Sequence, residues 1–298
     1  MQNAKLKNYL HLHFIVFVWG FTAVLGKIIT ISALPLVWYR MLIATVVILL
    51  FIGLKKISLK VNRKTVLSLF FAGVLIALHW VTFFMAIKVS NVSIALATMS
   101  TGTFFTAILE PIWYGRKMIW YEVVFGLIVI FGLYLIFSVE AVYFKGIIIA
   151  LISAFLVTLF SLINGKLAHQ LKPSVISFYE LGSGVLFLSI YLLFSRGFTA
   201  EFFQLSINDF LFIFILASIC TAYAFIASVK IMQYLSPYTV MLTINLEPIY
   251  GIMLAFLFIG ESEKMSPLFY GGALLILGMV VANGVLKNKT LLKKRRRA

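Results

Sequence analysis

A carboxylate stands inside a long apolar segment near the C-terminal end of this sequence. Glu247 lies near the middle of residues 237–259 and is followed directly by Pro248. Because proline has no N–H to donate, the carbonyl of Ile244 loses its helical partner, and an acid beside a free carbonyl can hold a proton or a cationic group. We therefore predict a binding site that includes Glu247 and the adjacent Asn245. A neutral Glu247 that hydrogen-bonds a neighbouring helix and stabilises a kink is the alternative.

Three more ionisable side chains interrupt apolar segments. His79 precedes Trp80 and carries an imidazole that can change charge near neutral pH, although a hydrogen bond between helices is its alternative role. Arg40 and Glu180 occupy near-equivalent places in two other segments. We expect these two not to pair directly, and each to serve a gate on its own side, with Pro248 as a further gating residue. Snorkelling or a structural ion pair is the alternative.

Aromatic and hydroxyl side chains supply most of the other polar groups in these segments. Binding cavities are commonly apolar with a few placed polar groups. We expect Trp19, Tyr223 and Tyr250 to line such a cavity, because each ring has a polar handle. Ordinary helix packing explains any one of them equally well. Thr101 either lines the cavity or bonds back to its own helix.

Other chemistries find little support in the sequence. It has no phosphate-binding loop of the G-x-x-x-x-G-K-[ST] type, so ATP hydrolysis within this chain is not expected. The one cysteine, Cys220, excludes an intrachain disulfide and does not favour a thiolate metal site. His11 and His13 lack a nearby acid or cysteine that would complete a catalytic site. We therefore expect no enzyme activity, no metal and no cofactor.

The composition indicates that these segments lie in a membrane. Of 298 residues, 63% are hydrophobic and 11% are charged, whereas soluble domains have about 25% charged residues. A membrane span needs about 20 mostly apolar residues. The chain offers ten such segments, which predict an all-α integral membrane protein: 9–30, 34–54, 65–87, 92–113, 120–137, 143–163, 174–194, 209–232, 237–259 and 267–286.

Basic residues predict the orientation of the chain. The net charge of +16 would suggest nucleic acid as the partner of a soluble protein, but here Lys and Arg gather in short connections and in the tail 287–298. With ten spans, both termini lie on the same side of the membrane, and most Lys and Arg residues lie on that side. Because basic residues are enriched in cytoplasmic segments, this predicts that both termini are cytoplasmic. The tail would contact anionic lipids. We expect no nucleic-acid partner.

A weak internal repeat divides the ten predicted spans into two fives. At one constant offset, Ser90 corresponds to Ser236 and Leu96 to Leu242, at the fourth and ninth spans. The matches continue in order into the following spans, with Gly126 on Gly272, Ile130 on Ile276 and Gly132 on Gly278. The repeats would cover residues 1–138 and 139–286. Because five is odd, the second repeat would be inverted in the membrane, an arrangement typical of transporters. Chance similarity between apolar segments is the alternative.

Several motifs resemble the EamA-type transporters of the drug/metabolite transporter superfamily. They are Ser236-Pro237-Tyr238-Thr239, Leu246-Glu247-Pro248-Ile249-Tyr250, Gly260-Glu261, Trp19-Gly20-Phe21 and Arg40. The resemblance covers essentially the whole chain. It implies secondary transport, often export, of amino acids, metabolites or drugs through a central cavity lined by the first, third, fourth, sixth, eighth and ninth spans. Gly102 stands where the family often has proline, and Tyr114-Gly115 where it often has Gly-Glu. We therefore expect a less kinked fourth span.

These observations predict a transporter of small metabolites. The chain would export its solute across the cell membrane by alternating access, as a monomer or homodimer, with proton coupling through Glu247 left open. A membrane-embedded lipid-modifying enzyme and a channel are the alternatives. The enzyme would need a cluster of catalytic polar residues at the interface. The channel would need a continuous polar path.

Overall fold

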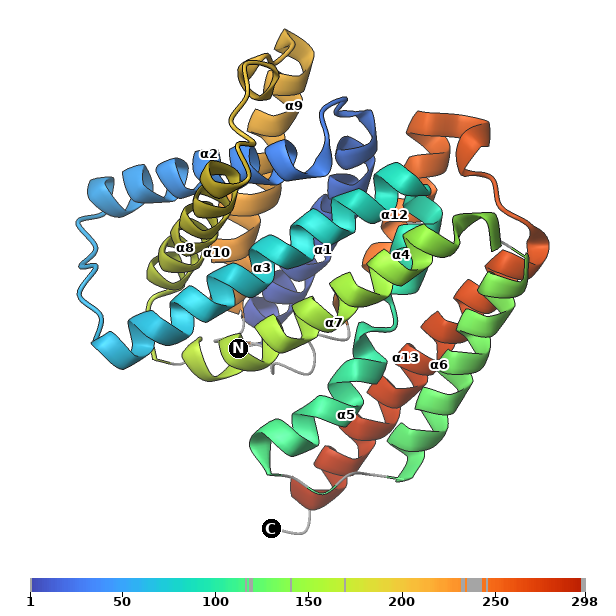
Figure 1. Ribbon diagram of the computed structural model, residues 1–298. Coiled ribbons are helices and arrows are strands. Elements are labelled where there is room, and N and C mark those ends of the chain that lie inside the picture. The colour runs from blue at the N-terminus through green and yellow to red at the C-terminus, as the bar shows by residue number, and fades with distance from the viewer. Residues whose placement is uncertain are drawn as a thin grey trace.

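The computed structural model describes residues 2–115, 117, 120–139, 141–168, 170–231, 234, 243–244 and 246–295. These residues form helices joined by short connections, without a β-strand among them. Figure 1 shows the helices as one bundle in which α6 and α13 run side by side. In chain order the elements are α1 Gln2–Ile28, α2 Ala33–Leu54, α3 Arg63–Val89, α4 Val92–Met99, α5 Gly102–Tyr114, α6 Trp120–Val139, η1 Ala141–Tyr143, α7 Phe144–Leu167, α8 Pro173–Phe194, η2 Glu201–Phe203, α9 Ile207–Ala217, η3 Ser218–Tyr223, α10 Ala224–Ile231, α12 Glu247–Ile259, η4 Gly260–Glu263 and α13 Pro267–Arg295.

The predicted all-helical membrane protein is confirmed. Large apolar side chains point outward, with Leu50 63% and Leu257 72% exposed; lipid solvates such a surface and water does not. Two shorter apolar helices lie within α6 and α13, at Val124–Ile136 and Pro267–Met279. Among the described residues, seven helical stretches are long and apolar enough to cross a membrane, namely Lys7–Ile28, Ala33–Leu54, Arg63–Val89, Val92–Tyr114, Ala141–Leu167, Pro173–Phe194 and Ile207–Ile231.

Three predicted spans differ by more than four residues from the helices at their ends. The first was expected to begin at residue 9, but α1 begins at Gln2. The ninth, 237–259, lies partly outside the described residues, and its second part forms α12 from Glu247 onward. The tenth was expected to end at residue 286, but α13 continues to Arg295. Lys and Arg are good helix formers, so the basic tail can extend the helix beyond the apolar segment.

The predicted fourth span, 92–113, is interrupted in the middle. Ser100 and Thr101 separate α4 from α5. The Thr101 hydroxyl donates a hydrogen bond of 2.8 Å to the carbonyl of Thr98. A hydroxyl that bonds back to the backbone in this way competes with the regular helical pattern. The break therefore arises without a proline, and the straighter helix expected from Gly102 is not observed.

A π-helical turn, η3, lies between α9 and α10. Within it the Thr221 hydroxyl donates a hydrogen bond of 2.8 Å to the carbonyl of Leu216, five residues back. Such turns are rare, and they often occur at functional sites because they redirect side chains. Here the turn packs against α2 and brings the Thr221 side chain to that helix.

Glycines allow two helix pairs to cross closely. A Cβ atom on Gly20 of α1 would lie 2.9 Å from the nitrogen of Gly251 in α12. A Cβ atom on Gly272 of α13 would lie 2.9 Å from the carbonyl oxygen of Gly132 in α6. Small residues let two backbones approach in this way, which compensates for the absence of a hydrophobic driving force between helices in lipid.

The contacts between helices occur in matching pairs. Helix α1 of the first half packs against α12 of the second, and its counterpart α7 packs in the same way against α4 and α5 of the first half. Helix α3 packs against α7 and α8, as α9 and η3 pack against α1 and α2. Three further pairs, α2 with α8, α4 with α12 and α6 with α13, map onto themselves when the two halves of the chain are exchanged.

Candidate functional site

A cavity of about 280 Å³ lies between the two halves of the chain. Its walls come from α1, α3, α4, α5, α7, α10 and α12, and from single long side chains of α2 and α8. The family resemblance implied walls from the first, third, fourth, sixth, eighth and ninth spans. The structure adds the second and seventh, because Arg40 and Glu180 reach the cavity from α2 and α8.

Seven of the predicted site residues line this cavity: Trp19, Arg40, His79, Trp80, Glu180, Glu247 and Pro248. The other described ones lie elsewhere. Thr101 is fully buried at the break between α4 and α5. The hydroxyl of Tyr223 lies 2.5 Å from Nε2 of His11, and that of Tyr250 lies 3.4 Å from Nδ1 of His13, so both tyrosines contact α1 outside the cavity wall. Asn245 lies outside the described residues.

Arg40 is buried at one part of the cavity, with 2% of its surface exposed. Its Nε donates a hydrogen bond of 2.7 Å to the hydroxyl of Thr221, the residue that the π-helical turn presents. The guanidinium carbon lies 3.8 Å from the centre of the Trp80 ring. A planar guanidinium stacks well on an aromatic face, so Trp80 and Thr221 fix its orientation. The Nη1 atom is buried and has no hydrogen-bond partner within the described part of the chain.

Glu180 lies in a second polar part of the cavity. Asn164 of α7 donates a hydrogen bond of 2.8 Å from Nδ2 to Oε1 of Glu180, which is 1% exposed. The Oδ1 atom of Asn164 is buried, and none of the described residues hydrogen-bonds to it. Arg40 and Glu180 thus have different hydrogen-bond partners, in line with the expectation that they do not pair directly.

His79 forms a hydrogen-bonded link between α3 and α7. Its Nδ1 lies 3.1 Å from the carbonyl oxygen of Ser153, and the Ser153 hydroxyl donates a bond of 2.9 Å to the carbonyl of His79. Because a carbonyl oxygen only accepts, Nδ1 is the donor in the first bond. This reciprocal pair corresponds to the interhelical role that the sequence left open for His79.

Glu247 stands at the start of α12, and Pro248 occupies the first turn. The sequence predicted a proline kink inside a helix, but proline at a first turn removes no helical bond because its N–H would have been unpaired. The acidic side chain is favourable there, since helix N-termini carry partial positive charge. Glu247 also interacts electrostatically with Arg40 across the cavity.

A family model for EamA-like transporters matches the chain twice, over residues 7–138 and 144–284. The chain belongs to the EamA-like transporter family. This confirms the resemblance that the sequence motifs indicated, and the two matched segments together cover most of the chain.

A solved structure supports the same fold for this EamA-like protein. It is described only as a crystal structure of a protein, and it is 14% identical to this chain, with a TM-score of 0.65. The likeness covers 93% of this chain and 97% of the other. A search of curated proteins found no match. At this identity the similarity shows the fold alone.

Polar contacts connect several elements at one end of the EamA-like bundle. The Asp209 carboxylate at the start of α9 accepts hydrogen bonds from the Thr30 amide at 2.7 Å and from the Thr30 hydroxyl at 2.6 Å. Nearby, the ammonium of Lys88 donates to the Ile29 carbonyl at 2.6 Å. These charge-assisted bonds join the connection after α1 to α3 and α9.

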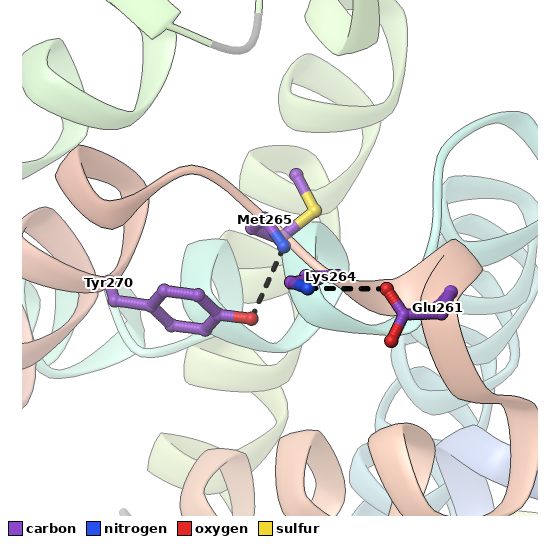
Figure 2. Close-up of polar contacts among 4 residues, drawn as sticks. All are labelled: Glu261, Lys264, Met265 and Tyr270. Atoms are coloured by element: carbon purple, nitrogen blue, oxygen red, sulfur yellow. Dashed lines mark hydrogen bonds and ion pairs between the residues drawn. The ribbon is translucent and has the colours of Figure 1, made fainter.

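A second buried carboxylate joins the other elements at this end. Glu263 is 1% exposed and accepts hydrogen bonds from the amides of Val92 at 3.1 Å and Ser93 at 3.0 Å. It therefore satisfies the first N–H groups of α4. Figure 2 shows the adjoining segment, where Glu261 and Lys264 form an ion pair of 3.4 Å and the Tyr270 hydroxyl accepts from the Met265 amide at 3.2 Å. The former pair is mostly exposed.

Sequence reasoning missed three residues of this site: Thr221, Asn164 and Ser153. Asn164 carried a usable signal, since it is an amide inside an apolar segment, where polar groups usually find a partner across the bundle. Thr221 and Ser153 carried none, because small hydroxyl residues are common in membrane helices and can bond to their own backbone.

Proposed function

We propose that this EamA-like protein is a secondary transporter that exports a small organic solute from the cell by alternating access. The proposed architecture has ten spans in two inverted repeats, residues 1–138 and 139–286, in the cell membrane with both termini cytoplasmic. Its solute is a small amphipathic metabolite, such as an amino acid or a drug-like compound.

One observation carries this proposal: a single cavity between the halves contains the side chains of Arg40, Glu180 and Glu247. Ionisable groups are expensive in a membrane, and they are kept where they bind a solute or an ion. The remaining wall is mostly apolar, with Phe83, Phe160 and Phe225 among its residues. Such a mixture suits a solute with a polar group on an apolar body.

The repeat supports alternating access. The family model matches two consecutive segments, and the helix contacts form pairs that an exchange of the halves would generate. Two similar halves of opposite direction can each form a gate toward one side of the membrane. The contacts of Asp209 and Glu263 would then close the outer gate.

Counterflow in proteoliposomes tests the proposal. Candidate solutes come from comparing metabolites inside and outside cells with and without the protein. Purified protein should then exchange labelled solute faster when unlabelled solute is present on the opposite side. A channel gives flux without this acceleration, and an enzyme converts the solute instead of moving it. Either result would contradict the proposal.

Proton coupling through Glu247 is part of the proposal and has its own test. Transport into proteoliposomes is measured with and without an imposed pH gradient, at equal solute concentrations. A coupled carrier accumulates solute against the solute's concentration gradient when the pH gradient is present. It loses that ability when a protonophore is added. Equilibration alone under both conditions would show an uncoupled carrier.

A further inference from the structure

Two unpartnered polar atoms belong to side chains that line the same cavity. They are Nη1 of Arg40, a hydrogen-bond donor, and Oδ1 of Asn164, an acceptor. Buried polar atoms are almost always paired, because an unpaired one costs its full desolvation free energy. Among the described residues, neither atom has a hydrogen-bond partner in this conformation.

The neighbours of Arg40 explain why a ligand is needed to complete it. Thr221 occupies Nε, and Trp80 covers one face of the guanidinium. Glu247 interacts with the charge electrostatically but does not hydrogen-bond Nη1. A guanidinium held by Nε and by one face presents its remaining N–H groups in a fixed plane, which is the geometry that carboxylates fit best.

Aromatic rings connect Arg40 to Asn164 along the cavity wall. The Trp80 ring, which lies under Arg40, is 5.6 Å from the ring of Phe225. Phe225 is in turn 6.0 Å from Phe160. Phe160 and Asn164 are four residues apart in α7 and so share one face of that helix. The wall between the two polar sites is therefore an apolar, aromatic surface.

We propose that this cavity binds an amphipathic monocarboxylate, with the carboxylate on Arg40, an aromatic or aliphatic body against Trp80, Phe225 and Phe160, and an N–H donor on Oδ1 of Asn164. The cavity volume of about 280 Å³ limits the occupant to a small molecule. This inference rests on the proposed function, because it assigns the solute class to the same cavity.

Three matched compounds test the two ends separately. Indole-3-propionate has both groups, its primary amide lacks the carboxylate, and its 1-methyl derivative lacks the N–H donor. Binding is measured on the full-length protein in nanodiscs, without a transport assay. We expect the amide to bind about tenfold to a hundredfold more weakly than the acid, and the 1-methyl compound about threefold to tenfold more weakly.

Two variants assign each preference to its residue. Arg40→Gln should remove the preference for the acid over the amide but retain the preference for N–H over N-methyl. Asn164→Leu should do the reverse. Arg40→Lys keeps the positive charge without the planar fork, so it should retain part of the acid preference. A residue with only a structural role would weaken all three compounds by the same factor.

The results separate this inference from the proposed function. Equal binding of the three compounds by the natural protein, or no binding of any of them at millimolar concentration, overturns the inference. If Arg40→Gln unfolds, Arg40→Lys decides the question, because an unchanged ratio of acid to amide binding there contradicts a planar carboxylate contact. The expected binding pattern could also be observed in a protein that shows no counterflow of any solute. That result would overturn the proposed transport function and still support the proposed binding site.

Discussion

The hydroxyl of Thr221 accepts a hydrogen bond of 2.7 Å from Nε of Arg40 and donates one of 2.8 Å to the carbonyl of Leu216. A single small side chain thus couples the π-helical turn of the eighth segment to the charged group of the second. The coupling links a local backbone irregularity to the position of a cavity residue.

Replacing Thr221 with valine should release Arg40. The variant keeps the shape of the side chain but leaves Nε buried without an acceptor, which costs about 1–3 kcal/mol of stability. Unfolding of the purified protein by a chemical denaturant in detergent measures this change. Thr221→Ser retains the hydroxyl and is the matched control. Equal stability of the valine and serine variants would show that the bond contributes nothing.

Replacing Glu247 with glutamine should impair transport without unfolding the protein. The change keeps the size of the side chain and removes its charge, so transport should fall about tenfold or more, equivalent to about 1.4 kcal/mol. The initial rate of counterflow and its pH profile are the measurements. Glu261→Gln is the matched control, because it makes the same chemical change at a carboxylate that is 79% exposed and lies outside the cavity wall. An unchanged pH profile of counterflow in Glu247→Gln would show that Glu247 takes no part in proton coupling.

Replacing Asp209 with alanine should open the proposed outer gate. The change removes both bonds to Thr30, so the cavity should become more accessible from that end. The probe is a cysteine introduced at position 99, on the cavity wall, in a protein that also has Cys220→Ser. In right-side-out vesicles, an impermeant maleimide should label this cysteine faster after the Asp209→Ala change. The exposed pair of Glu261 and Lys264 provides a control.

Lys264→Gln should leave this labelling unchanged. Its side chain is 64% exposed and pairs only with the 79% exposed Glu261, and exposed ion pairs contribute little to stability. Equal labelling rates in Asp209→Ala, Lys264→Gln and the parent protein would show that Asp209 does not hold this end closed.

Replacing Gly73 with alanine should disturb the crossing of α3 and α8. A Cβ atom there would overlap the carbonyl oxygen of Glu180 and lie 2.8 Å from Cβ of Ser183. Forcing apart packed backbones costs about 1–3 kcal/mol. Gly53→Ala is the control because a Cβ atom at Gly53 meets nothing within 4 Å. Denaturation of both variants in detergent should show a loss only at Gly73.

Both termini should be cytoplasmic. The measurement is protease sensitivity of short tags placed before Lys5 and after residue 298. In intact cells both tags should be protected, and both should be cleaved after permeabilisation. The physical reason is the excess of Lys and Arg on that side, which resists translocation. Cleavage of either tag in intact cells would refute this topology.

The sequence by itself determined that the chain lies in a membrane and which family it resembles. It also identified most of the ionisable residues of the cavity. Apolar segments of membrane-spanning length cannot be solvated by water, so the membrane fold followed from composition. Arg40, Glu180 and Glu247 could be selected because a charge in an apolar segment is costly wherever it lies. The sequence shows this cost directly, because it shows which charges stand within apolar segments.

Only the tertiary structure decided which partners these residues have. Tyr223 and Tyr250 looked like cavity residues, but they contact the histidines of α1. Thr221 reaches Arg40 through a π-helical turn, and Asn164 reaches Glu180 across two helices. The rotation of each helix about its axis determines such contacts, and nearly uniform apolar segments leave that rotation unspecified. Packing of the whole bundle fixes it, because each helix must be rotated so that its glycines lie at the close crossings and its polar side chains face the neighbouring helices.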